Sequence, residues 1–504
     1  MRDMKDIRRS HPRSRTAGLA LLLAAAPALG LSASPAAASS ATGSSATGSS
    51  GTGSSATGSS ATVAGHGAHH LPSVTVRRGG PAHTVHVTAD RSGEAVVTLS
   101  SRAPGISWGT KGAESAVVSA FVDGRYATDI VIPSDQPITR DFSLGHLTRG
   151  RHTLAFRFAA DRSPRAATRA VLGGIGLTVY GETTDMGLIL RNAPVLYGRN
   201  LPDLGTPFQS STTDAPLYEY HEVLPATTPG HKVLQYTVIW TNEDGGTNSP
   251  ALMARWGRTT DIEWAYDVEV DAQGEPVPGT GVYQAANHQT LVFAGTYEGD
   301  RPRLETCTSN NNLCDTVDDP MRFSPAPVQE LPAGQPREHM MDVNPWLYPV
   351  MAQEMTREGK IESPSSPATP ELGDQRTYLY LAVAHTATPS TDAGAVGLSV
   401  GVRLKGDPTL YRSNHVDPTW SITREGTAAT TVELPAGTTQ SDIAEIVALR
   451  TPVTETGASL TVTAVTRAFF LQDDYLPADS FLSWTGSTVL TQAAPEAPLY
   501  TAAG

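Results

Sequence analysis

The alternation of apolar and polar residues along the chain predicts strands far more often than helices. From His152 to Phe158, aromatic and aliphatic side chains occupy every second position, which is the period of a strand with one buried face. Turn signals separate this run from its neighbours, and Asp123-Gly124 predicts a hairpin. We therefore predict a small β-sandwich module over residues 71–181. Its strand-like runs lie at residues 85–88, 94–100, 117–122, 130–132, 151–158 and 175–180.

A second, larger β unit is predicted over residues 182–504. Its core motif region, residues 215–320, contains a strong strand signal from Val233 to Trp240 and another from His288 to Gly295. Strand patterns return between residues 375 and 490, and we expect these C-terminal strands to pair with the central ones. The predicted fold class is mainly β: an N-terminal β-sandwich module followed by a larger β-sandwich-like domain with one or two short helices.

One segment, between residues 338 and 360, has the signals of a helix. Asn344 is a suitable N-cap, and Pro345 suits the first helical position because its missing N–H needs no partner there. The helical stretch runs from Trp346 to Gly359-Lys360, where the glycine is expected to end it.

The most distinctive pattern covers residues 261–271, where acidic and apolar residues alternate. Positions 261, 263, 267, 269 and 271 are acidic, Ala265 is the one gap, and the even positions are apolar or aromatic. This alternation predicts a strand with a dry face and an acidic face. Asp261 and Glu263 would project the same way, with their Cα atoms roughly 6.5 Å apart. We expect Arg258 to lie close by, because five carboxylates on one face repel one another unless a positive charge offsets them.

Two kinds of chemistry suit paired carboxylates on one strand face. Asp261 and Glu263 can hold a hard cation such as Ca²⁺ or Mg²⁺, because these ions prefer carboxylate oxygen ligands. They can also divide the acid and base roles in cleavage of a glycosidic bond. The alternative is an ordinary solvated strand face, which is often charged in antiparallel sheets.

Residues 257–263, Gly-Arg-Thr-Thr-Asp-Ile-Glu, resemble the acidic motif Gly-His-Arg-His-Asp-Trp-Glu of the necrosis-inducing family of secreted proteins. They are also similar to a motif of a fungal family named for vacuolar protein sorting. The resemblance covers residues 215–320. It implies a β-sandwich on which Asp261 and Glu263 belong to a divalent-metal site.

A later stretch, residues 288–297, is similar to the His-containing strand that follows the acidic motif in the vacuolar-sorting type. This makes His288 the candidate third metal ligand. The sequence departs from the necrosis-inducing pattern at two positions, since Arg258 and Thr260 stand where that family has histidines. The loss of these two histidines argues against both metal binding and toxicity.

The N-terminal segment predicts export from the cell. The first fifteen residues carry six Lys or Arg, an apolar run extends from Ala17 to Leu31, and Ala36-Ala37-Ala38 is a small-residue cleavage site. This layout predicts a signal peptide over residues 1–38 and a secreted, extracellular protein. The apolar run is shorter than the ~20 residues that a membrane span needs, and we expect no span elsewhere. Residues 39–70 repeat Ser, Thr and Gly and predict a low-complexity linker.

The chain has two cysteines, Cys307 and Cys314. In an exported protein, a close pair of cysteines predicts a disulfide. The enclosed loop is short, so the expected stabilisation is about 2–3 kcal/mol. We expect the bond to pin the Asn-rich segment 308–313.

The charge balance excludes two classes of partner. With 37 Lys and Arg against 50 Asp and Glu, the formal net charge is −13, and it becomes −17 without the predicted signal peptide. A chain this acidic repels nucleic acid and anionic lipid. The sequence also lacks a Gly-x-Ser-x-Gly elbow, a P-loop and a dinucleotide-binding fingerprint, so ATP, NAD and elbow-type esterase chemistry lose support.

Three hypotheses for the function remain. Residues 147–154 resemble a strand of carbohydrate-binding and immunoglobulin-like sandwich modules, which implies an accessory module that either binds glycan or serves as a structural spacer. The first hypothesis is a secreted carbohydrate-active protein acting on polysaccharide or cell-surface glycan. The predicted export, the separate module, the acidic strand and aromatic residues such as Tyr218 and Tyr220 favour it. A glycan hydrolase of this kind would use Asp261, Glu263, His288 and Arg258 as its catalytic centre. The second hypothesis is a metal-dependent, lectin-like or toxin-like surface binder with Ca²⁺ or Mg²⁺ on Asp261, Glu263 and His288. The third is a non-catalytic extracellular envelope protein.

Overall fold

The computed structural model describes residues 73–198, 215–242, 248–389, 396–415, 417–454 and 457–502. The predicted signal peptide and linker, residues 1–38 and 39–70, lie outside the described residues. Strands dominate the described chain and its helices are short, so the prediction of a mainly β fold is confirmed. No described helix has both the length and the apolar character that crossing a membrane requires.

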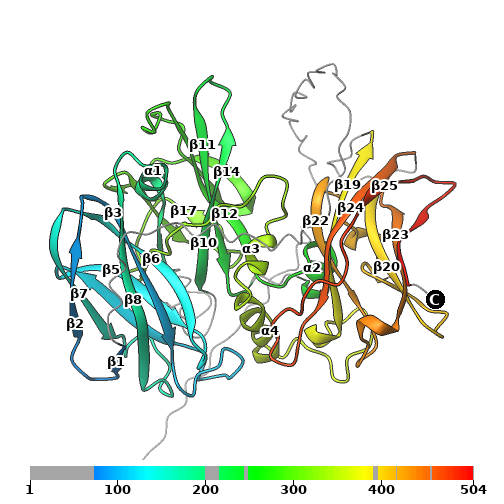
Figure 1. Cartoon of the computed structure of the whole chain (residues 1–504), viewed down its shortest axis with the longest axis horizontal. Coiled ribbons are helices and arrows are strands. Elements are labelled where there is room, and N and C mark those ends of the chain that lie inside the picture. The colour runs from blue at the N-terminus through cyan, green and yellow to red at the C-terminus, as the bar shows by residue number, and fades with distance from the viewer. Residues whose placement is uncertain are drawn as a thin grey trace, which may run out of the picture. The chain divides into compact units, whose positions relative to one another are not determined.

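Eight strands at the start of the described chain form two four-stranded sheets around one apolar core (Figure 1). The strand orders are β1-β8-β3-β6 and β2-β7-β4-β5, and Leu99, Ile130 and Phe156 are fully buried between the sheets. The predicted hairpin at Asp123-Gly124 joins β4 to β5, with the positive φ angles of 48° and 80° that such turns require. The strands are β1 (Val74–Arg77), β2 (His83–Ala89), β3 (Gly93–Arg102), β4 (Ala116–Val122), β5 (Arg125–Ile132), β6 (Ile138–Leu147), β7 (Gly150–Phe158) and β8 (Arg169–Gly181).

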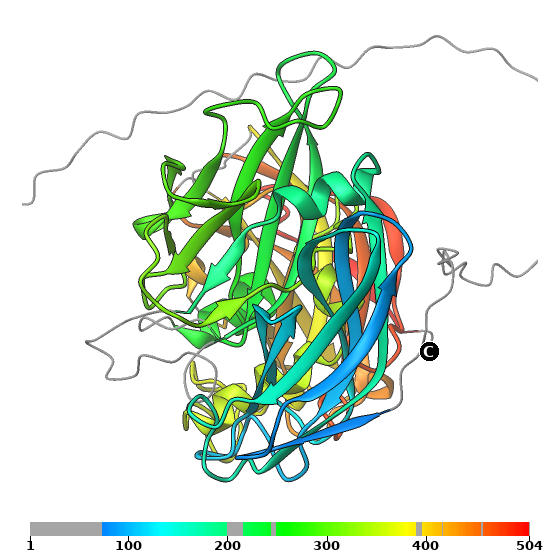
Figure 2. The same cartoon turned by 90° about the vertical axis from the view of Figure 1, so that its left-hand side faces the viewer.

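The central sheet has ten strands, in the order β10-β11-β12-β13-β17-β16-β9-β18, with β14 paired to β13 and β15 paired to β16 (Figure 2). Its long antiparallel part is β10-β11-β12, whose buried aromatic side chains include Tyr220, Tyr236 and Tyr266. The strands are β9 (Val195–Tyr197), β10 (Pro216–Pro225), β11 (Lys232–Trp240), β12 (Ile262–Val270), β13 (Val282–Ala285), β14 (Gln289–Val292), β15 (Tyr297–Glu298), β16 (Arg301–Thr306), β17 (Leu313–Cys314) and β18 (Arg322–Phe323).

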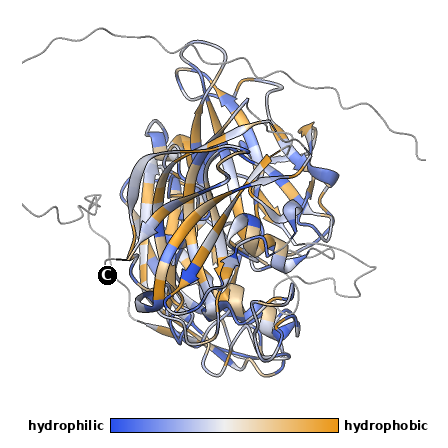
Figure 3. Cartoon of the chain, turned by 90° about the vertical axis from the view of Figure 1, so that its right-hand side faces the viewer, coloured by the Kyte–Doolittle hydropathy of each residue, from blue (hydrophilic) through white to orange (hydrophobic). Residues whose placement is uncertain are grey.

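The C-terminal strands form two sheets of their own, β22-β19-β24-β25 and β21-β20-β23-β26. The expectation that they pair with the central strands is wrong, because the ladders of the described residues join them only to one another. The two sheets pack face to face, and Leu398 and Val465 lie in the apolar core that they share. Figure 3 shows this part of the chain coloured by hydropathy. The strands are β19 (Tyr378–Thr388), β20 (Val396–Leu404), β21 (Leu410–Arg412), β22 (Gly426–Glu433), β23 (Ile443–Pro452), β24 (Ser459–Phe470), β25 (Trp484–Leu490) and β26 (Glu496–Thr501).

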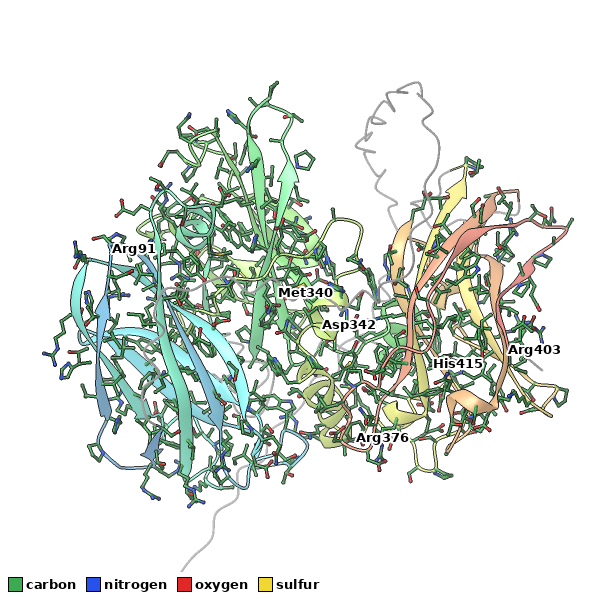
Figure 4. All side chains as sticks on the ribbon, in the orientation of Figure 1. Arg91, Met340, Asp342, Arg376, Arg403 and His415 are labelled. Carbon is green, nitrogen blue, oxygen red and sulfur yellow. A yellow bond between two sulfur atoms is a disulfide. The ribbon has the colours of Figure 1, made fainter. Side chains whose placement is uncertain are left out.

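The described chain contains four α-helices, and α4 is the one that the sequence predicts. Its N-cap position is Trp346, which makes no capping hydrogen bond with its side chain. The predicted cap, Asn344, instead donates its side-chain amide to the Met340 carbonyl at 2.9 Å. Gly359, with φ 70°, follows its C-terminal end as expected. Figure 4 labels Met340 and Asp342 in the short helix α3. The helices are α1 (Asp185–Asn192), α2 (Ser249–Trp256), α3 (His339–Asp342) and α4 (Leu347–Arg357).

A buried cluster of charged and aromatic side chains joins the first sandwich to α4. Trp108 is fully buried, and its indole N–H donates to the Glu354 carboxylate on α4. Arg357 contacts the same carboxylate, and its guanidinium lies 5.2 Å from the centre of the Trp108 ring. Glu114, from the loop that carries Trp108, lies 4.0 Å from Arg357. Because buried charges are costly unless they are paired, this cluster specifies how α4 meets the loop.

Candidate functional site

A β-bulge interrupts the acidic strand β12. Tyr266 pairs with Tyr236 on β11 while Trp264 pairs with the next residue, Thr237, so Ala265 has no partner of its own in this ladder. Residues directly opposite in a ladder share a face of the sheet, and one extra residue reverses the alternation beyond it. The bulge therefore lies at the single gap in the acidic pattern.

The bulge divides the acidic residues between the two faces of the sheet. Glu263 lies opposite Val238 and Asp267 lies opposite Gln235. Val238 and Gln235 are three residues apart on β11, so they face opposite sides. The expectation of one continuous acidic face is wrong, although Asp261 and Glu263 do share a face, because Asp261 continues the ladder opposite Trp240.

The carboxylates beyond the bulge have local partners. Asp267 accepts a hydrogen bond from the Gln235 amide at 3.1 Å, and His231 Nδ1 lies 2.6 Å from Glu269. Burial raises the pKa of Asp267 to about 6, and the Gln235 hydrogen bond opposes that shift. These two carboxylates form part of the ordinary strand-to-strand contacts between β11 and β12.

Asp261 is buried rather than displayed on a strand surface. Its residue is 1% exposed, and its backbone carbonyl accepts from the Trp240 N–H at 2.9 Å. Its carboxylate accepts from the Asn311 side-chain amide at 3.0 Å. The same amide lies 3.1 Å from the Asn242 carbonyl. Asp261 therefore lies behind the Asn-rich loop and is shielded from large ligands.

Four polar side chains from three segments form a hydrogen-bonded series, which we name the polar row: Glu263, Gln284, His288 and Asn310. The Gln284 amide nitrogen lies 2.8 Å from the Glu263 carboxylate and 2.9 Å from His288 Nδ1, so its two N–H bonds serve both neighbours. Asn310 lies 3.1 Å from His288 Nε2. His288 is exposed, Glu263 and Asn310 are half-buried, and Gln284 is buried beneath them. Two of the predicted site residues, Glu263 and His288, are thus joined through Gln284.

His288 is held in an uncommon backbone conformation. Asn287 and His288 have φ angles of 58° and 56°, which are in the left-handed region that residues other than glycine rarely adopt. They form the turn from β13 to β14. The Gln284 and Asn310 amide nitrogens lie near Nδ1 and Nε2 of His288, and a neutral imidazole accepts a hydrogen bond at only one of these two ring nitrogens. The positive φ angles fix the path of the turn, and Asn and His adopt them more readily than most residues do.

The predicted disulfide between Cys307 and Cys314 is confirmed, with 5.8 Å between the Cα atoms. The loop that it closes presents two neighbouring asparagines. Asn310 contacts the polar row, and Asn311 contacts the buried Asp261. The crosslink therefore ties both halves of the candidate site to one short loop.

Arg258 pairs with Glu338, which lies outside the acidic strand. It is 3% exposed, its Nε donates to Glu338 at 3.0 Å, and its guanidinium also donates to the Thr260 carbonyl. The Trp256 ring lies 5.5 Å from it. The Arg337 guanidinium lies 3.9 Å from the Glu263 carboxylate. Arg337 was not expected from the sequence, because it is far away along the chain and lies outside any motif.

Glu219 is a second residue that the sequence analysis did not select. It lies opposite Val238 on β11, which itself lies opposite Glu263, so the three residues form a line across β10, β11 and β12. Glu219 is 0% exposed, and neither carboxylate oxygen has a hydrogen-bond partner among the described residues. Burial raises its pKa well above the usual range, and the charge of Arg301 opposes that shift. One acidic residue inside an aromatic run was its only sequence signal.

No group of three or more His, Cys, Asp or Glu side chains in the described segments is arranged to hold a metal ion. Among the three predicted ligands, Asp261 contacts Asn311, while Gln284 lies between Glu263 and His288. The predicted calcium or magnesium site stays a prediction.

No protein-family model and no curated protein matches the chain. Among solved structures, it is similar to a β-glucosidase from Paenibacillus barengoltzii, with 16% identity and a TM-score of 0.15 over 21% of this chain and 10% of that one. A family GH115 4-O-methyl-α-glucuronidase has 11% identity and a TM-score of 0.18 over 23% of this chain and 17% of that one. The C-terminal domain of EclA, a sugar-binding protein, has 12% identity and a TM-score of 0.16, covering 21% of this chain and 76% of that one. These TM-scores are too low to establish a shared fold, so any functional conclusion has to come from the site.

Proposed function

We propose that this is a secreted carbohydrate-binding protein that binds a polysaccharide or cell-surface glycan at the polar row. The observation that carries the proposal is the series of close polar contacts that joins Glu263, Gln284, His288 and Asn310, at 2.8, 2.9 and 3.1 Å. Carboxylate, amide and imidazole groups are planar and together offer both donors and acceptors. Sugar hydroxyl groups both donate and accept, so such a surface can pair with several of them at once.

The row is held in place before any ligand arrives. Glu263 and Gln284 are anchored on strands β12 and β13, and Asn310 belongs to the loop closed by the disulfide. His288 has an amide nitrogen close to each of its two ring nitrogens. A ligand that binds here pays little for ordering side chains, which favours affinity for flexible, hydroxyl-rich polymers.

An exposed apolar surface follows directly after the polar row. Strand β14 begins at Gln289 and is exposed along its whole length, with Leu291 43% exposed and Val292 61% exposed. Tyr297 is 50% exposed, and its ring packs against Phe293 at 4.9 Å. Sugar rings have apolar faces that pack on aliphatic and aromatic side chains, so β14 offers a place for the next units of a glycan.

Binding fits the geometry better than cleavage does. Hydrolysis of a glycosidic bond normally needs two carboxyl groups that flank it. The Glu263 side chain is 21% exposed, but Asp261 is 1% exposed behind the Asn-rich loop. Hydrolysis by this pair would therefore require the disulfide loop to leave Asp261, and we place glycan cleavage second to glycan binding.

The metal-dependent alternative makes a separate forecast. A cation held by Glu263 and His288 would have to displace Gln284, which now bonds to both. We therefore expect binding to proceed in the presence of EDTA. Binding that is lost in EDTA and restored by Ca²⁺ would favour the metal-dependent lectin instead.

The test is affinity electrophoresis of the purified full chain through gels that contain single polysaccharides. Retardation by at least one polysaccharide is expected, and His288→Ala should weaken it about tenfold, because the exposed imidazole no longer offers a hydrogen-bonding group to the sugar. Glu263→Gln should weaken it less, because the amide keeps one acceptor.

Glu269→Gln is the matched control, since Glu269 lies on the opposite face of the same strand. No retardation by any polysaccharide, or equal retardation of all variants, would reject the polar row. New reducing ends in the same mixtures would establish hydrolysis.

The proposed secretion has its own test. N-terminal sequencing of protein recovered from culture supernatant should find a chain that begins near Ser39. Recovery of protein with Met1 intact and only inside the cells would contradict it.

A further inference from the structure

A pocket with a volume of about 560 Å³ lies away from the polar row. Four segments form its walls: the N-terminal end of α2, the C-terminal end of α4, residues 370–372, and the short 3-10 helix η4 (Pro418–Trp420). Its volume is in the range of ~300–1,000 Å³ that is typical of small-ligand pockets. Of the signals found in the sequence, the Gly359-Lys360 stop of the predicted helix contributes to it.

The pocket has an apolar floor and a polar rim. Trp420 and Leu372 are almost completely buried and form the floor, with Pro250 and Pro370 beside them. The rim is exposed and polar, and it is formed by Asn248, Lys360 and Glu371. Lys360 is already paired with Glu358, so the Glu371 carboxylate is the unpaired charge among the described lining residues.

The aromatic part of the floor is rigidly placed. Asp417 caps η4 by accepting from the Thr419 N–H at 2.8 Å, and the Trp420 N–H donates to the Asp417 carbonyl at 3.1 Å. The ring of His415, labelled in Figure 4, packs edge-on against the Trp420 ring with 5.7 Å between the centroids. The indole is therefore fixed in the absence of a ligand.

The other walls are also anchored by hydrogen bonds. Asn248 caps α2 by accepting from the Ala251 N–H at 3.1 Å. At the end of α4, the Lys360 N–H donates to the Met355 carbonyl at 3.0 Å, and its ammonium lies 2.6 Å from Glu358. The Leu372 carbonyl accepts from the N–H of residue 362 at 2.8 Å. The pocket is consequently a built feature of the fold rather than a space between loose side chains.

We infer that this pocket is a second saccharide site, which takes one neutral sugar unit at the end of a short oligosaccharide. An apolar floor with an indole suits the C–H face of a sugar ring, while donors and acceptors on the rim suit its peripheral hydroxyls. Lys360 supplies donors and Glu371 supplies acceptors. Lys360 is already paired with Glu358 and Glu371 is an anion, so the rim gives no advantage to an acidic sugar, and this favours a neutral one. The inference shares its ligand class with the proposed function but uses none of the residues of the polar row.

The experiment titrates the full chain with cellobiose, maltose and mannobiose while its tryptophan fluorescence is recorded. At least one disaccharide should change the emission saturably. Trp420→Phe should abolish the change, whereas Trp484→Phe, a tryptophan on β25 in another part of the chain, should retain it. Because Trp420→Phe is a core substitution, the exposed rim variants Lys360→Ala and Glu371→Ala provide a second measurement, and each should raise the Kd about tenfold. Lys405→Ala is the matched exposed control.

The outcomes separate this site from the polar row. If no disaccharide changes the emission, or if the rim variants bind as tightly as Lys405→Ala, the pocket is not a sugar site, even where polysaccharide retardation persists. If retardation is absent but the disaccharide response depends on Trp420 and the rim, the pocket stands and the polar row fails. A response that survives all three pocket substitutions overturns the inference.

Discussion

The side-chain amide of Asn311 donates to the buried carboxylate of Asp261 across 3.0 Å. This contact joins the disulfide loop to the start of the acidic strand. It makes the crosslink part of the site, although the two cysteines lie well beyond the acidic motif in sequence.

Loss of the crosslink should therefore affect both stability and binding. Replacing Cys307 and Cys314 together by Ser should lower the free energy of unfolding by about 2–3 kcal/mol, because the open loop gains freedom in the unfolded chain. Polysaccharide retardation should fall as well, since Asn310 would no longer be held against His288. Urea unfolding and affinity electrophoresis check the two effects. An unchanged retardation would show that the loop does not organise the polar row.

The bulge at Ala265 allows a test of what sets the register of β12. Ala265 has no ladder partner of its own, so its deletion leaves the other residues opposite their present partners and should lower the free energy of unfolding by only about 1 kcal/mol. Deleting Val268, which pairs with Leu234, would instead bring Glu269 opposite Leu234, and we expect the free energy of unfolding to fall by more than about 3 kcal/mol. Chemical unfolding of both variants makes the comparison. Equal effects would mean that ladder pairing does not determine the register.

Glu433 should make the stability of the protein depend on pH. It is 2% exposed at the end of β22, and burial raises its pKa to about 7, although the Tyr378 hydroxyl donates to it at 3.0 Å and opposes the shift. Glu362 is the nearby anion that adds to the shift. A carboxyl group with a raised folded-state pKa contributes its full stability below about pH 4.5 and loses it as the pH rises to about 7.

Glu433→Gln should remove this dependence, because the amide stays neutral throughout. The wild-type free energy of unfolding should fall by about 2 kcal/mol relative to the variant between pH 4.5 and 7. Urea unfolding at several pH values measures both curves. Glu445→Gln, at a half-buried ion pair with Arg403, is the control. Parallel curves for the wild type and Glu433→Gln would contradict the assignment.

Glu219→Gln should stabilise the protein at neutral pH. The folded chain holds Glu219 in a site where burial raises its pKa, so folding at pH 7 carries the cost of protonating or burying the charge. The variant avoids that cost, and its advantage in melting temperature should shrink as the pH falls to 4. Calorimetry at the two pH values provides the measurement. A lower melting temperature for Glu219→Gln at pH 7 would instead indicate a favourable charged pair with Arg301.

The strands could be predicted from the sequence because each carries its own alternation, as Leu154, Phe156 and Phe158 show. The sheet that each strand joins could not be predicted, because it depends on which apolar faces fit one another in the folded chain. The C-terminal strands carry apolar residues like those of the central strands, and their sequence does not show that they pair only with one another. Helix α2 was missed, although Asn248 caps it and Pro250 lies in its first turn, because eight residues are too few for a clear helical period.

The candidate site was predicted in part. Alternation placed Asp261 and Glu263 on one face, and the family resemblance added His288. The pattern shows Ala265 only as the one non-acidic residue in the acidic series. It does not show that Ala265 is a bulge, because a bulge inserts a residue without changing the composition around it. Gln284 and Asn310 escaped notice because isolated amides carry no motif, and only the folded sheet brings them beside His288.

The buried contact of Trp108 with Glu354 and Arg357 has a practical meaning for anyone who divides the chain. The first sandwich looks like a detachable accessory by its sequence, yet it supplies the indole that covers an ion pair on α4. In a protein expressed from residue 182 onward, the Glu354–Arg357 ion pair would be exposed to water. The C-terminal end of α4, beside Lys360, would lose a packing contact. Fragments cut at this boundary should therefore be less soluble than the intact chain, and the proposed sugar binding is best measured on the intact chain.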